Sequence, residues 1–393
     1  MSLADKQRFA CPVAAQCGGC QLTRLSYAEQ LRLKQRRVEE LLLPLGPVVP
    51  IIGMAQPFHY RNKVHAVLGV DKRGNTIRGV YQAGTHRVVP VAHCLIEDER
   101  ADRIITTVHE LMRPFKLRPY NEYTQRGFLR HILVRVAHKT GQIMLVLVTT
   151  QPEFPSKANF VQAIRRAHPE ITTIVQNIND RRTSMVLGKS DIVLFGPGFV
   201  EDELCGKRFR ISAQSFYQIN SEQTEKLYRK AVEYAALQKD ETALDAYCGI
   251  GTIALTAAEH CAHMLGVELN PQAVKDAKQN AALNHAEHVS FLCGDAGECM
   301  SRMAQAGEKL DVAFMDPPRA GSDERFLQSL LTLHPARVVY ISCNPDTLRR
   351  DLDMLVRGGY RLAEATPVDM FPCTEHVETV CLLRYQAARQ PRG

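Results

Sequence analysis

Residues 244–255, LDAYCGIGTIAL, constrain the fold of this chain more than any other stretch. An apolar segment that is typical of a strand runs into a turn with Gly249 and Gly251, and a helix is predicted from Thr252 onward. Glycines let a ligand approach the backbone closely, and the first turn of a helix offers free N–H groups. A strand, a glycine-rich turn and a helix in this order are the usual seat of an adenosine-containing cofactor.

Strands and helices alternate from about residue 208 onward, which predicts a doubly wound α/β sheet in the C-terminal half. The predicted strands lie near 243–247, 264–268, 289–293, 311–315, 337–341 and 379–384. Carboxylates stand at the ends of three of them, at Glu268, Asp295 and Asp316. An acidic side chain at that edge of the sheet can bind the ribose hydroxyls of a nucleoside. The sequence has no GxxxxGK[ST] loop that would hold phosphates, so S-adenosylmethionine fits this pattern better than NAD or ATP.

Cys343 lies in VVYISCNPDTL, residues 338–348, directly after an apolar run that is typical of a buried strand. Reactive groups of α/β sheets gather at such strand ends. A thiol placed beside a cofactor site suggests covalent catalysis, although a core cysteine at a strand end is the simpler alternative. Seven further cysteines within or beside apolar elements are interpreted as buried thiols without a function: Cys205, Cys248, Cys261, Cys293, Cys299, Cys373 and Cys381.

Length and charge indicate two or three domains with different partners. The chain has 393 residues, more than one typical core organises. Residues 1–200 carry 28 lysines and arginines against 15 acidic residues, whereas residues 201–393 carry 21 against 27. This asymmetry either reflects arbitrary surface charge or indicates a polyanion-binding front half joined to a catalytic back half.

No apolar run approaches the roughly 18–20 residues that span a bilayer, and the N-terminus does not resemble a signal peptide. We therefore expect no membrane partner and a cytoplasmic location, where cysteines serve as metal ligands, nucleophiles or core residues rather than in disulfides.

Four zones are predicted along the chain. Residues 1–26 form a cysteine-rich segment, and residues 27–46 hold a helix that could pack on the catalytic domain. Residues 47–205 alternate short strands with turns and are expected to form an α+β domain that binds a polyanion, with helices at 97–113 and 156–167. Residues 206–393 form the predicted doubly wound domain.

In order, the motifs LDAYCGIGTIAL, MDPPRAG, YISCNPDTL and FPCTEHVETV resemble those of the RNA uridine C5-methyltransferases, which make 5-methyluridine in tRNA and 23S rRNA. The resemblance covers residues 11–385. It implies a Rossmann-like S-adenosylmethionine-dependent methyltransferase domain, with Cys343 as nucleophile and Glu378 of the HVE triplet as general base. The cofactor contacts that it implies are Gln218, Tyr247, Thr252, Glu268, Asp295 and Asp316. The family often has an asparagine where this chain has Thr252.

The chemistry is intelligible from the residues as well. Uracil C5 is a poor nucleophile, and thiolate addition at C6 supplies the electrons that let C5 attack a sulfonium methyl group. A free thiol with a pKa of about 8.5 is only slightly ionised at neutral pH, so the site must lower that pKa or work with a small thiolate fraction. A base must then remove the C5 proton. Glu378 is the first candidate, and His376, two residues away on the same expected strand face, is its rival. Arg319 could bind phosphate or pair with an acid.

Three cysteines near the N-terminus, Cys11, Cys17 and Cys20, have spacing typical of metal ligands, and Cys94 is the obvious fourth. Four thiolates suit zinc as well as an iron–sulfur cluster by spacing alone. The resemblance favours a [4Fe-4S] cluster, because a subset of the family carries one on this CGGC pattern. Many relatives begin with a small oligonucleotide-binding barrel, for which the sequence before Cys11 leaves no room.

The expected function is C5-methylation of a uridine in RNA, and the protein is expected to be a monomer. Cluster-bearing relatives act mostly on 23S rRNA, which favours that substrate over the T-loop uridine of tRNA. Two other functions compete with it. An amino-group RNA methyltransferase would use Asp316-Pro317-Pro318 alone, and a non-catalytic iron–sulfur protein would only bind RNA or sense redox state.

Overall fold

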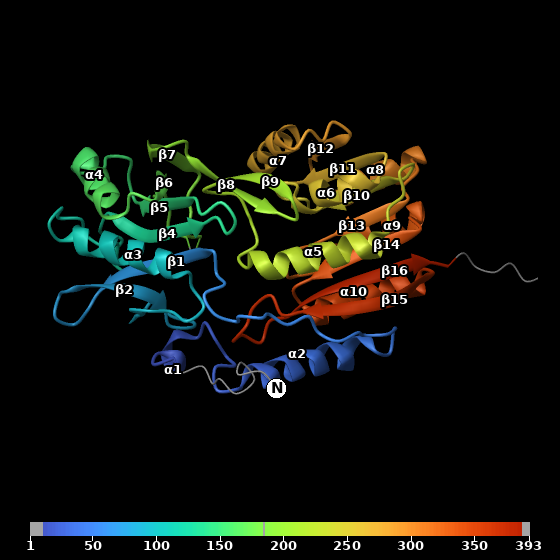
Figure 1. The fold of residues 1–393 in the computed structure, drawn as a ribbon, viewed down its shortest axis with the longest axis horizontal. Helices are drawn as coiled ribbons and strands as arrows, with labels where there is room; N and C mark the ends of the chain where they lie inside the picture. The colour runs from blue at the N-terminus through green and yellow to red at the C-terminus, as the bar shows by residue number, and fades with distance from the viewer. Residues whose placement is uncertain (1–10, 184, 387–393) are drawn as a thin grey trace, which may run out of the picture.

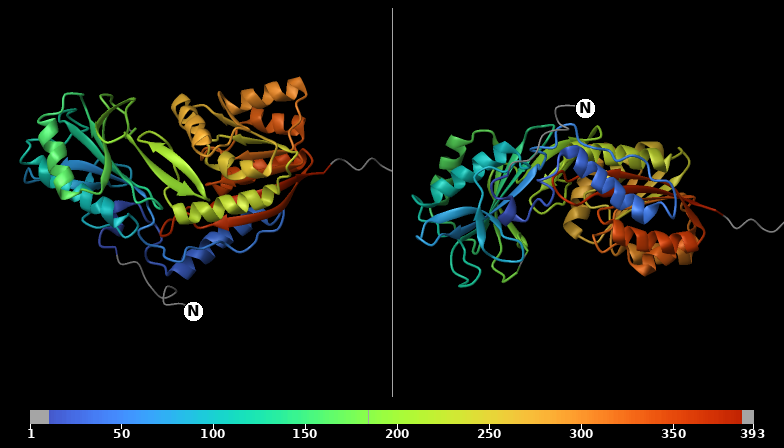
Figure 2. Two further views of the ribbon diagram at one scale, coloured as in Figure 1. Left: turned by 45° about the horizontal axis from the view of Figure 1, so that its top comes forward. Right: turned by 90° about the horizontal axis from the view of Figure 1, so that it is seen from below.

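The computed structural model describes residues 11–183 and 185–386 and contains two sheet-centred bodies with a β hairpin between them (Figures 1 and 2). Residues 1–10 of the predicted cysteine-rich segment and residues 387–393 of the predicted C-terminal domain lie outside the described residues. No helix in the described ranges combines the length and the apolar character needed to cross a membrane.

The C-terminal body is built on a seven-stranded sheet in the order β12-β11-β10-β13-β14-β16-β15. The first five strands in this order run parallel, and β16 is antiparallel to both β14 and β15. This arrangement confirms the predicted doubly wound sheet. The strand order reverses between β10 and β13, where an open α/β sheet binds its ligand. The strands are β10 (Thr242–Ala246), β11 (His263–Glu268), β12 (Val289–Cys293), β13 (Val312–Met315), β14 (Arg337–Ser342), β15 (Tyr360–Val368) and β16 (Glu378–Tyr385).

Helices cover both faces of this sheet, because alternate strand residues are apolar on both sides. One face is covered by α5 (Ser221–Ala235), α6 (Thr252–Ala257) and α7 (Pro271–Leu283), with the short helix η2 (Ala258–His260) following α6. The other face is covered by α8 (Ala296–Ala306), α9 (Glu324–Leu333), α10 (Pro345–Arg357) and α2 (Tyr27–Leu42).

Helix α2 belongs to the C-terminal body although it precedes the central domain in sequence (Figure 1). Ser26 and Glu29 form a capping box that fixes its first turn. Val38 and Leu42 are fully buried in the same apolar core as α8, α9 and α10. The helix predicted within residues 27–46 is thus confirmed, and its apolar stripe is covered by the C-terminal body.

A buried ion pair ties α2 to the loop after β15. Lys34 Nζ donates to Asp369 Oδ1 at 2.5 Å, and both side chains are 0% exposed. The same ammonium group donates to the carbonyl of Phe371 at 3.0 Å. The chain after α2 then follows β15, so that Val49 N donates to Ala365 O. Residues 27–49 and 360–371 therefore pack together.

The central domain holds a second seven-stranded sheet in the order β3-β2-β1-β4-β5-β6-β7. All neighbouring strands are antiparallel except β5 and β6, which α4 connects. Helices α3 (Glu99–Met112) and α4 (Lys157–Ala167) bury one face, which confirms the predicted helices at 97–113 and 156–167. The strands are β1 (Lys63–Val70), β2 (Thr76–Tyr81), β3 (Val88–Pro90), β4 (Leu129–Val136), β5 (Ile143–Thr149), β6 (Ile171–Ile178) and β7 (Ser190–Phe195).

The hairpin of β8 (Phe199–Leu204) and β9 (Lys207–Ser212) lies between the two bodies (Figure 1). Its turn is at Cys205–Gly206, so the domain boundary predicted at 205/206 falls inside a hairpin rather than in a linker. Its apolar residues pack in the core that also holds α5 and the open face of the central sheet. The hairpin thus joins the two bodies.

Candidate active site

The carboxyl ends of the parallel strands bring the predicted cofactor residues together. Ala246 in β10 lies opposite both Val267 in β11 and Met315 in β13. The residues that follow these three, Tyr247, Glu268 and Asp316, therefore stand side by side at the point where the strand order reverses.

The turn after β10 has the backbone that its glycines predict. Gly249 and Gly251 have positive φ angles of 54° and 83°, and Tyr247 also has a positive φ of 65°. A Cβ atom on Gly251 would lie 2.8 Å from the Phe291 ring, so no larger residue fits there without movement. Gly249 N donates to Glu268 Oε2 at 3.1 Å, which orients that carboxylate at the edge of the turn.

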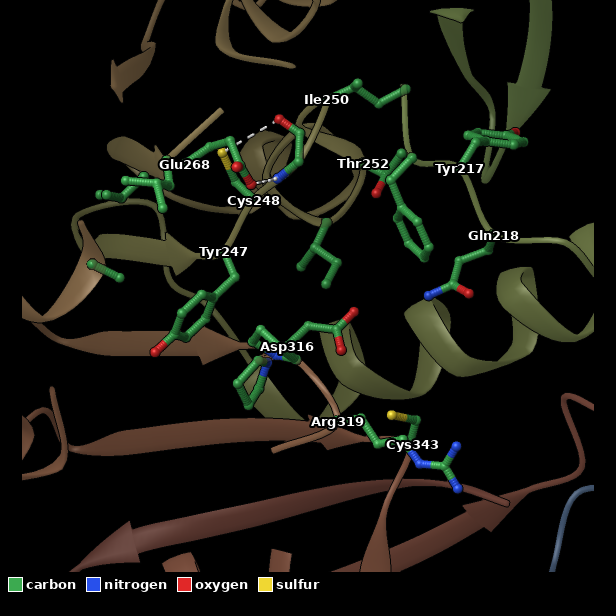
Figure 3. A pocket seen from close by; sticks show the side chains of 18 of the residues that line it. Tyr217, Gln218, Tyr247, Cys248, Ile250, Thr252, Glu268, Asp316, Arg319 and Cys343 are labelled. Atoms are coloured by element: carbon green, nitrogen blue, oxygen red, sulfur yellow. Dashed lines mark hydrogen bonds between the residues drawn. The ribbon is translucent and has the colours of Figure 1, made fainter. Parts of the chain in front are cut away.

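One cavity of about 750 Å³ opens at this edge, and Figure 3 shows the side chains that point into it. All eight residues predicted for catalysis and cofactor binding line it: Gln218, Tyr247, Thr252, Glu268, Asp295, Asp316, Cys343 and Glu378. Its volume is in the range of cavities that hold small molecules and cofactors.

Strand register places Cys343 beside Glu378. Ser342 at the end of β14 lies opposite Thr379 in antiparallel β16, so the next residues outward, Cys343 and Glu378, face each other. Residues opposed in this way have Cα atoms about 4.5–5.5 Å apart. The thiol and the carboxyl group, 35 positions apart in sequence number, thereby enter the cavity from neighbouring strand ends.

The electrostatics of this corner favour protonated groups in the ligand-free protein. Burial, together with the nearby charges of Glu378 and Asp316, raises the pKa of Cys343 to about 11. Burial raises the pKa of Asp316 to about 7, and burial and Asp316 raise the pKa of Glu378 well above its ordinary value. The sequence left open whether the site lowers the pKa of the Cys343 thiol or works with a small thiolate fraction. Because this pKa is raised, the second possibility is favoured. Closely spaced acids with raised pKa values in a cavity are typical of a catalytic site.

The comparisons with known proteins agree with this geometry. Residues 26–386 match the family model described as tRNA (uracil-5-)-methyltransferase. This chain belongs to that family. It is an S-adenosylmethionine-dependent RNA methyltransferase of the uracil-5 class with a Rossmann-like catalytic domain.

Two curated relatives and one solved structure show how far the similarity extends. An uncharacterized RNA methyltransferase of Halalkalibacterium halodurans is 45% identical over 384 residues, covering 96% of this chain and 84% of the relative. One from Staphylococcus aureus is 43% identical over 377 residues, covering 95% of this chain and 83% of the relative. The crystal structure of Pyrococcus abyssi tRNA (uracil-54, C5)-methyltransferase with S-adenosyl-L-homocysteine has a TM-score of 0.77 and 27% identity, covering 93% of this chain and 85% of that one.

His376 of the methyltransferase lies elsewhere than expected, and Arg319 lies close to it. His376 lies in the loop before β16 rather than on the strand with Glu378, and it is not among the residues that line the cavity. Its Nδ1 lies 3.4 Å from an Arg319 guanidinium nitrogen, and burial and Arg319 lower its pKa. Arg319 itself is exposed and lines the cavity, so its cation faces the space that a substrate would enter.

Four aromatic residues that sequence reasoning missed also line the cavity: Phe216, Tyr217, Tyr228 and Phe371. Phe216 is 66% exposed at the surface, Tyr228 is buried in α5, and Phe371 comes from the loop after β15. The Tyr228 hydroxyl lies 3.2 Å from Thr252 Oγ1. Phe216 stands two residues before the predicted contact Gln218. This nearness in sequence is the signal by which Phe216 could have been predicted.

A second, smaller cavity of about 90 Å³ is lined by Cys11, Cys17, Cys20 and Cys94, the four cysteines predicted as metal ligands. Cys373 lines it as well. As they stand, the described residues 11–183 and 185–386 hold no group of three or more His, Cys, Asp or Glu side chains set to hold a metal ion. The chemistry of the donor set nevertheless fits a soft metal centre, since four thiols from two chain segments line one cavity.

The loop of residues 371–377 contributes lining residues to both cavities. Phe371 lines the large cavity and Cys373 the small one. Leu22 N, two residues after Cys20, donates to Cys373 O at 2.9 Å. The segment that carries the N-terminal cysteines is thus hydrogen-bonded to the loop that leads into Glu378.

Proposed function

We propose that this methyltransferase adds a methyl group to C5 of a uridine in RNA, with Cys343 as the nucleophile and Glu378 as the base. The observation that carries the proposal is the register that sets Cys343 beside Glu378 in a cavity that Asp316 also lines. A thiol and a carboxyl group in this arrangement can act on the two neighbouring carbons C6 and C5 of one uracil ring.

In the first step, the sulfur of Cys343 forms a bond to C6 while the thiol proton passes to Asp316, whose pKa of about 7 suits it as an acceptor. The electrons of the C5–C6 double bond move toward O4, and C5 becomes nucleophilic. S-adenosylmethionine supplies the methyl group that C5 takes, and S-adenosylhomocysteine leaves. Arg319, exposed at the cavity, is placed to attract the RNA backbone or the developing negative charge.

In the second step, Glu378 removes the C5 proton, which requires the minor, ionised form of its carboxyl group. The electrons re-form the C5–C6 double bond, the C6–S bond breaks, and Cys343 leaves as a thiolate that takes up a proton. Burial raises the pKa of Glu378, which makes its carboxylate a stronger base for this task. His376 is the weaker candidate, since its ring is turned to Arg319 and lies outside the lining of the cavity.

The proposed cofactor contacts are supported by the hydrogen bonds of these side chains and by their place in the cavity. Glu268 accepts from Gly249 N and from Asn270 N, so its carboxylate is held at the position that binds ribose hydroxyls. Asp295 caps α8 and pairs with Arg325 at 2.6 Å. The other proposed contacts, which all line the same cavity, are Gln218, Tyr247, Thr252 and Asp316.

For the small cavity, we propose that Cys11, Cys17, Cys20 and Cys94 hold a [4Fe-4S] cluster, with zinc as the alternative. Their convergence on one cavity supports a metal centre, and the resemblance to cluster-bearing relatives favours iron. Bound there, the group would cross-link the N-terminal segment to the central domain.

The proposed substrate is a uridine of 23S rRNA, bound by the basic central domain. The specific observation in favour of tRNA is the similarity to the Pyrococcus abyssi enzyme, which acts on uracil-54 of tRNA. Mass mapping of 5-methyluridine in rRNA and tRNA from a deletion strain distinguishes the two, because only the true target loses the modification.

Trapping with RNA that contains 5-fluorouridine tests the chemistry. Fluorine at C5 cannot be removed as a proton, so wild-type protein should form a stable covalent complex that migrates slowly in a denaturing gel. Cys343→Ala should form none and still bind S-adenosylmethionine, whereas Cys205→Ala, at a half-buried thiol outside the cavity, should trap like wild type. Methyl transfer without any trapped complex would refute the thiol-addition route.

A further inference from the structure

A groove of about 620 Å³ lies on the central domain, apart from the methyltransferase cavity, and no residue lines both. Its lining comes from strands β1, β2 and β3 and from three loops, at residues 71–73, 86–87 and 120–123. Figure 1 shows β2 on the side of the central domain that faces away from the C-terminal sheet. The start of β1 contacts the Gln218 segment, and β1 then extends eight residues, about 26 Å at 3.3 Å per residue, to the groove.

Aromatic rings form a ladder along this groove. The Tyr81 and His86 rings lie 5.4 Å apart, and the His86 and Tyr123 rings 6.0 Å apart, both at 89°. Tyr123 is 77% exposed, and its backbone is held because Asn121 Oδ1 accepts from Tyr123 N and Thr124 N, both at 2.9 Å. A large apolar face held in water at a defined place is suited to stack on a planar ligand.

Positive charge surrounds the ladder. Lys72, Arg73 and Arg87 line the groove and are exposed, and none of the three forms an ion pair within the described residues. The two carboxylates in the lining are already engaged. Glu122 pairs with the buried Arg130 at 2.9 Å, and Asp71 accepts from the backbone of its own turn. The groove therefore presents cations beside free ring faces.

We infer that this groove binds an unpaired segment of the RNA substrate, with a base stacked on Tyr123 and phosphates at Lys72, Arg73 and Arg87. Aromatic faces next to backbone-binding cations are how proteins hold single-stranded nucleic acid. Bases in a duplex are already stacked on each other, so a ring ladder selects unpaired nucleotides. The inference rests on the proposed function, and it places a second RNA contact one length of β1, about 26 Å, beyond the Gln218 segment.

Binding of a fluorescein-labelled oligouridylate, measured by fluorescence anisotropy, tests the groove directly. Tyr123→Ala should weaken binding roughly fivefold or more, the loss expected for one stacked base. Tyr123→Phe, which keeps the ring, should bind like wild type. Lys72→Ala/Arg73→Ala should lower the slope of log affinity against log salt by about 1.4, the value for two lost phosphate contacts on a single strand. Lys157→Ala/Arg166→Ala on exposed α4 removes the same charge from the same domain and should leave the slope nearly unchanged.

Methyl transfer to in vitro transcribed 23S rRNA and tRNA separates this inference from the proposed function. Tyr123→Ala should raise KM for the RNA substrate while kcat and the KM for S-adenosylmethionine stay at wild-type values. If wild type methylates RNA and Tyr123→Ala matches it in both KM and oligouridylate affinity, the groove is not an RNA site. If wild type methylates neither RNA, the proposed function fails, and the anisotropy measurements still decide the groove.

Discussion

Replacing Lys34 by methionine should strongly destabilise the C-terminal body. The Lys34 and Asp369 side chains are both 0% exposed and lie 2.5 Å apart, so the substitution leaves a carboxylate buried without its cation. Removing one partner of such a pair costs about 3–5 kcal/mol. Whole domains are stable by only about 5–15 kcal/mol, so this one change should remove a large part of the total.

The measurement is urea unfolding followed by far-ultraviolet circular dichroism, since the sequence has no tryptophan to report by fluorescence. Lys34→Met/Asp369→Leu should recover most of the loss, because replacing both charges by apolar groups is often neutral or stabilising. Arg37→Ala, one turn further along α2, is the matched control. Its ion pair with Asp346 is half exposed and should be worth at most about 1 kcal/mol. A Lys34→Met cost as small as that of Arg37→Ala would refute the reasoning.

Three further predictions concern the two cavities. Glu378→Gln should still allow addition of Cys343 and methyl transfer but should leave the C5 proton in place. A methylated RNA–protein adduct should therefore accumulate and appear in a denaturing gel. Normal turnover by Glu378→Gln, with an adduct in His376→Ala instead, would make His376 the base. Because the pKa of Asp316 is raised to about 7 and that of Cys343 to about 11, kcat/KM should fall as pH drops through the neutral range, and a profile that is flat below pH 7 would contradict this. Cys94→Ser should lose iron and its brown colour in anaerobic preparations and keep wild-type affinity for S-adenosylmethionine, whereas a colourless wild-type protein with one bound zinc would contradict the proposed cluster.

The doubly wound sheet and its site were predictable because motif residues stand where strands end. Tyr247, Glu268 and Asp316 each follow or close an apolar run, and parallel strands bring such positions to one edge whatever the loops do. The pairing of Cys343 with Glu378 came only from family resemblance. It depends on β16 entering antiparallel beside β14, and no local pattern in the sequence specifies that neighbour.

Other features depend on partners that are distant in sequence. SMVLG, residues 184–188, holds a short apolar run like those of the predicted strands, yet residues 185–188 form a loop and residue 184 lies outside the described part of the chain. Side-chain amides take the backbone groups that a strand would pair: Asn179 Nδ2 donates to Met185 O, and Gly188 N donates to Asn177 Oδ1. His376 was expected on the same strand face as Glu378 because the two residues are two positions apart. This spacing does not show where the strand begins, and β16 begins only at Glu378.

The contact between Leu22 and Cys373 has a consequence for biosynthesis. Lys34 and Asp369 are separated by 335 residues, which a ribosome adds in roughly 20–70 s at 5–20 residues per second. Until then, the nascent N-terminal segment has neither the loop that receives Leu22 nor the strand that covers α2. Its cysteines therefore emerge first and are enclosed last, so any metal acquired during translation would have to be loaded into an open, partly folded chain.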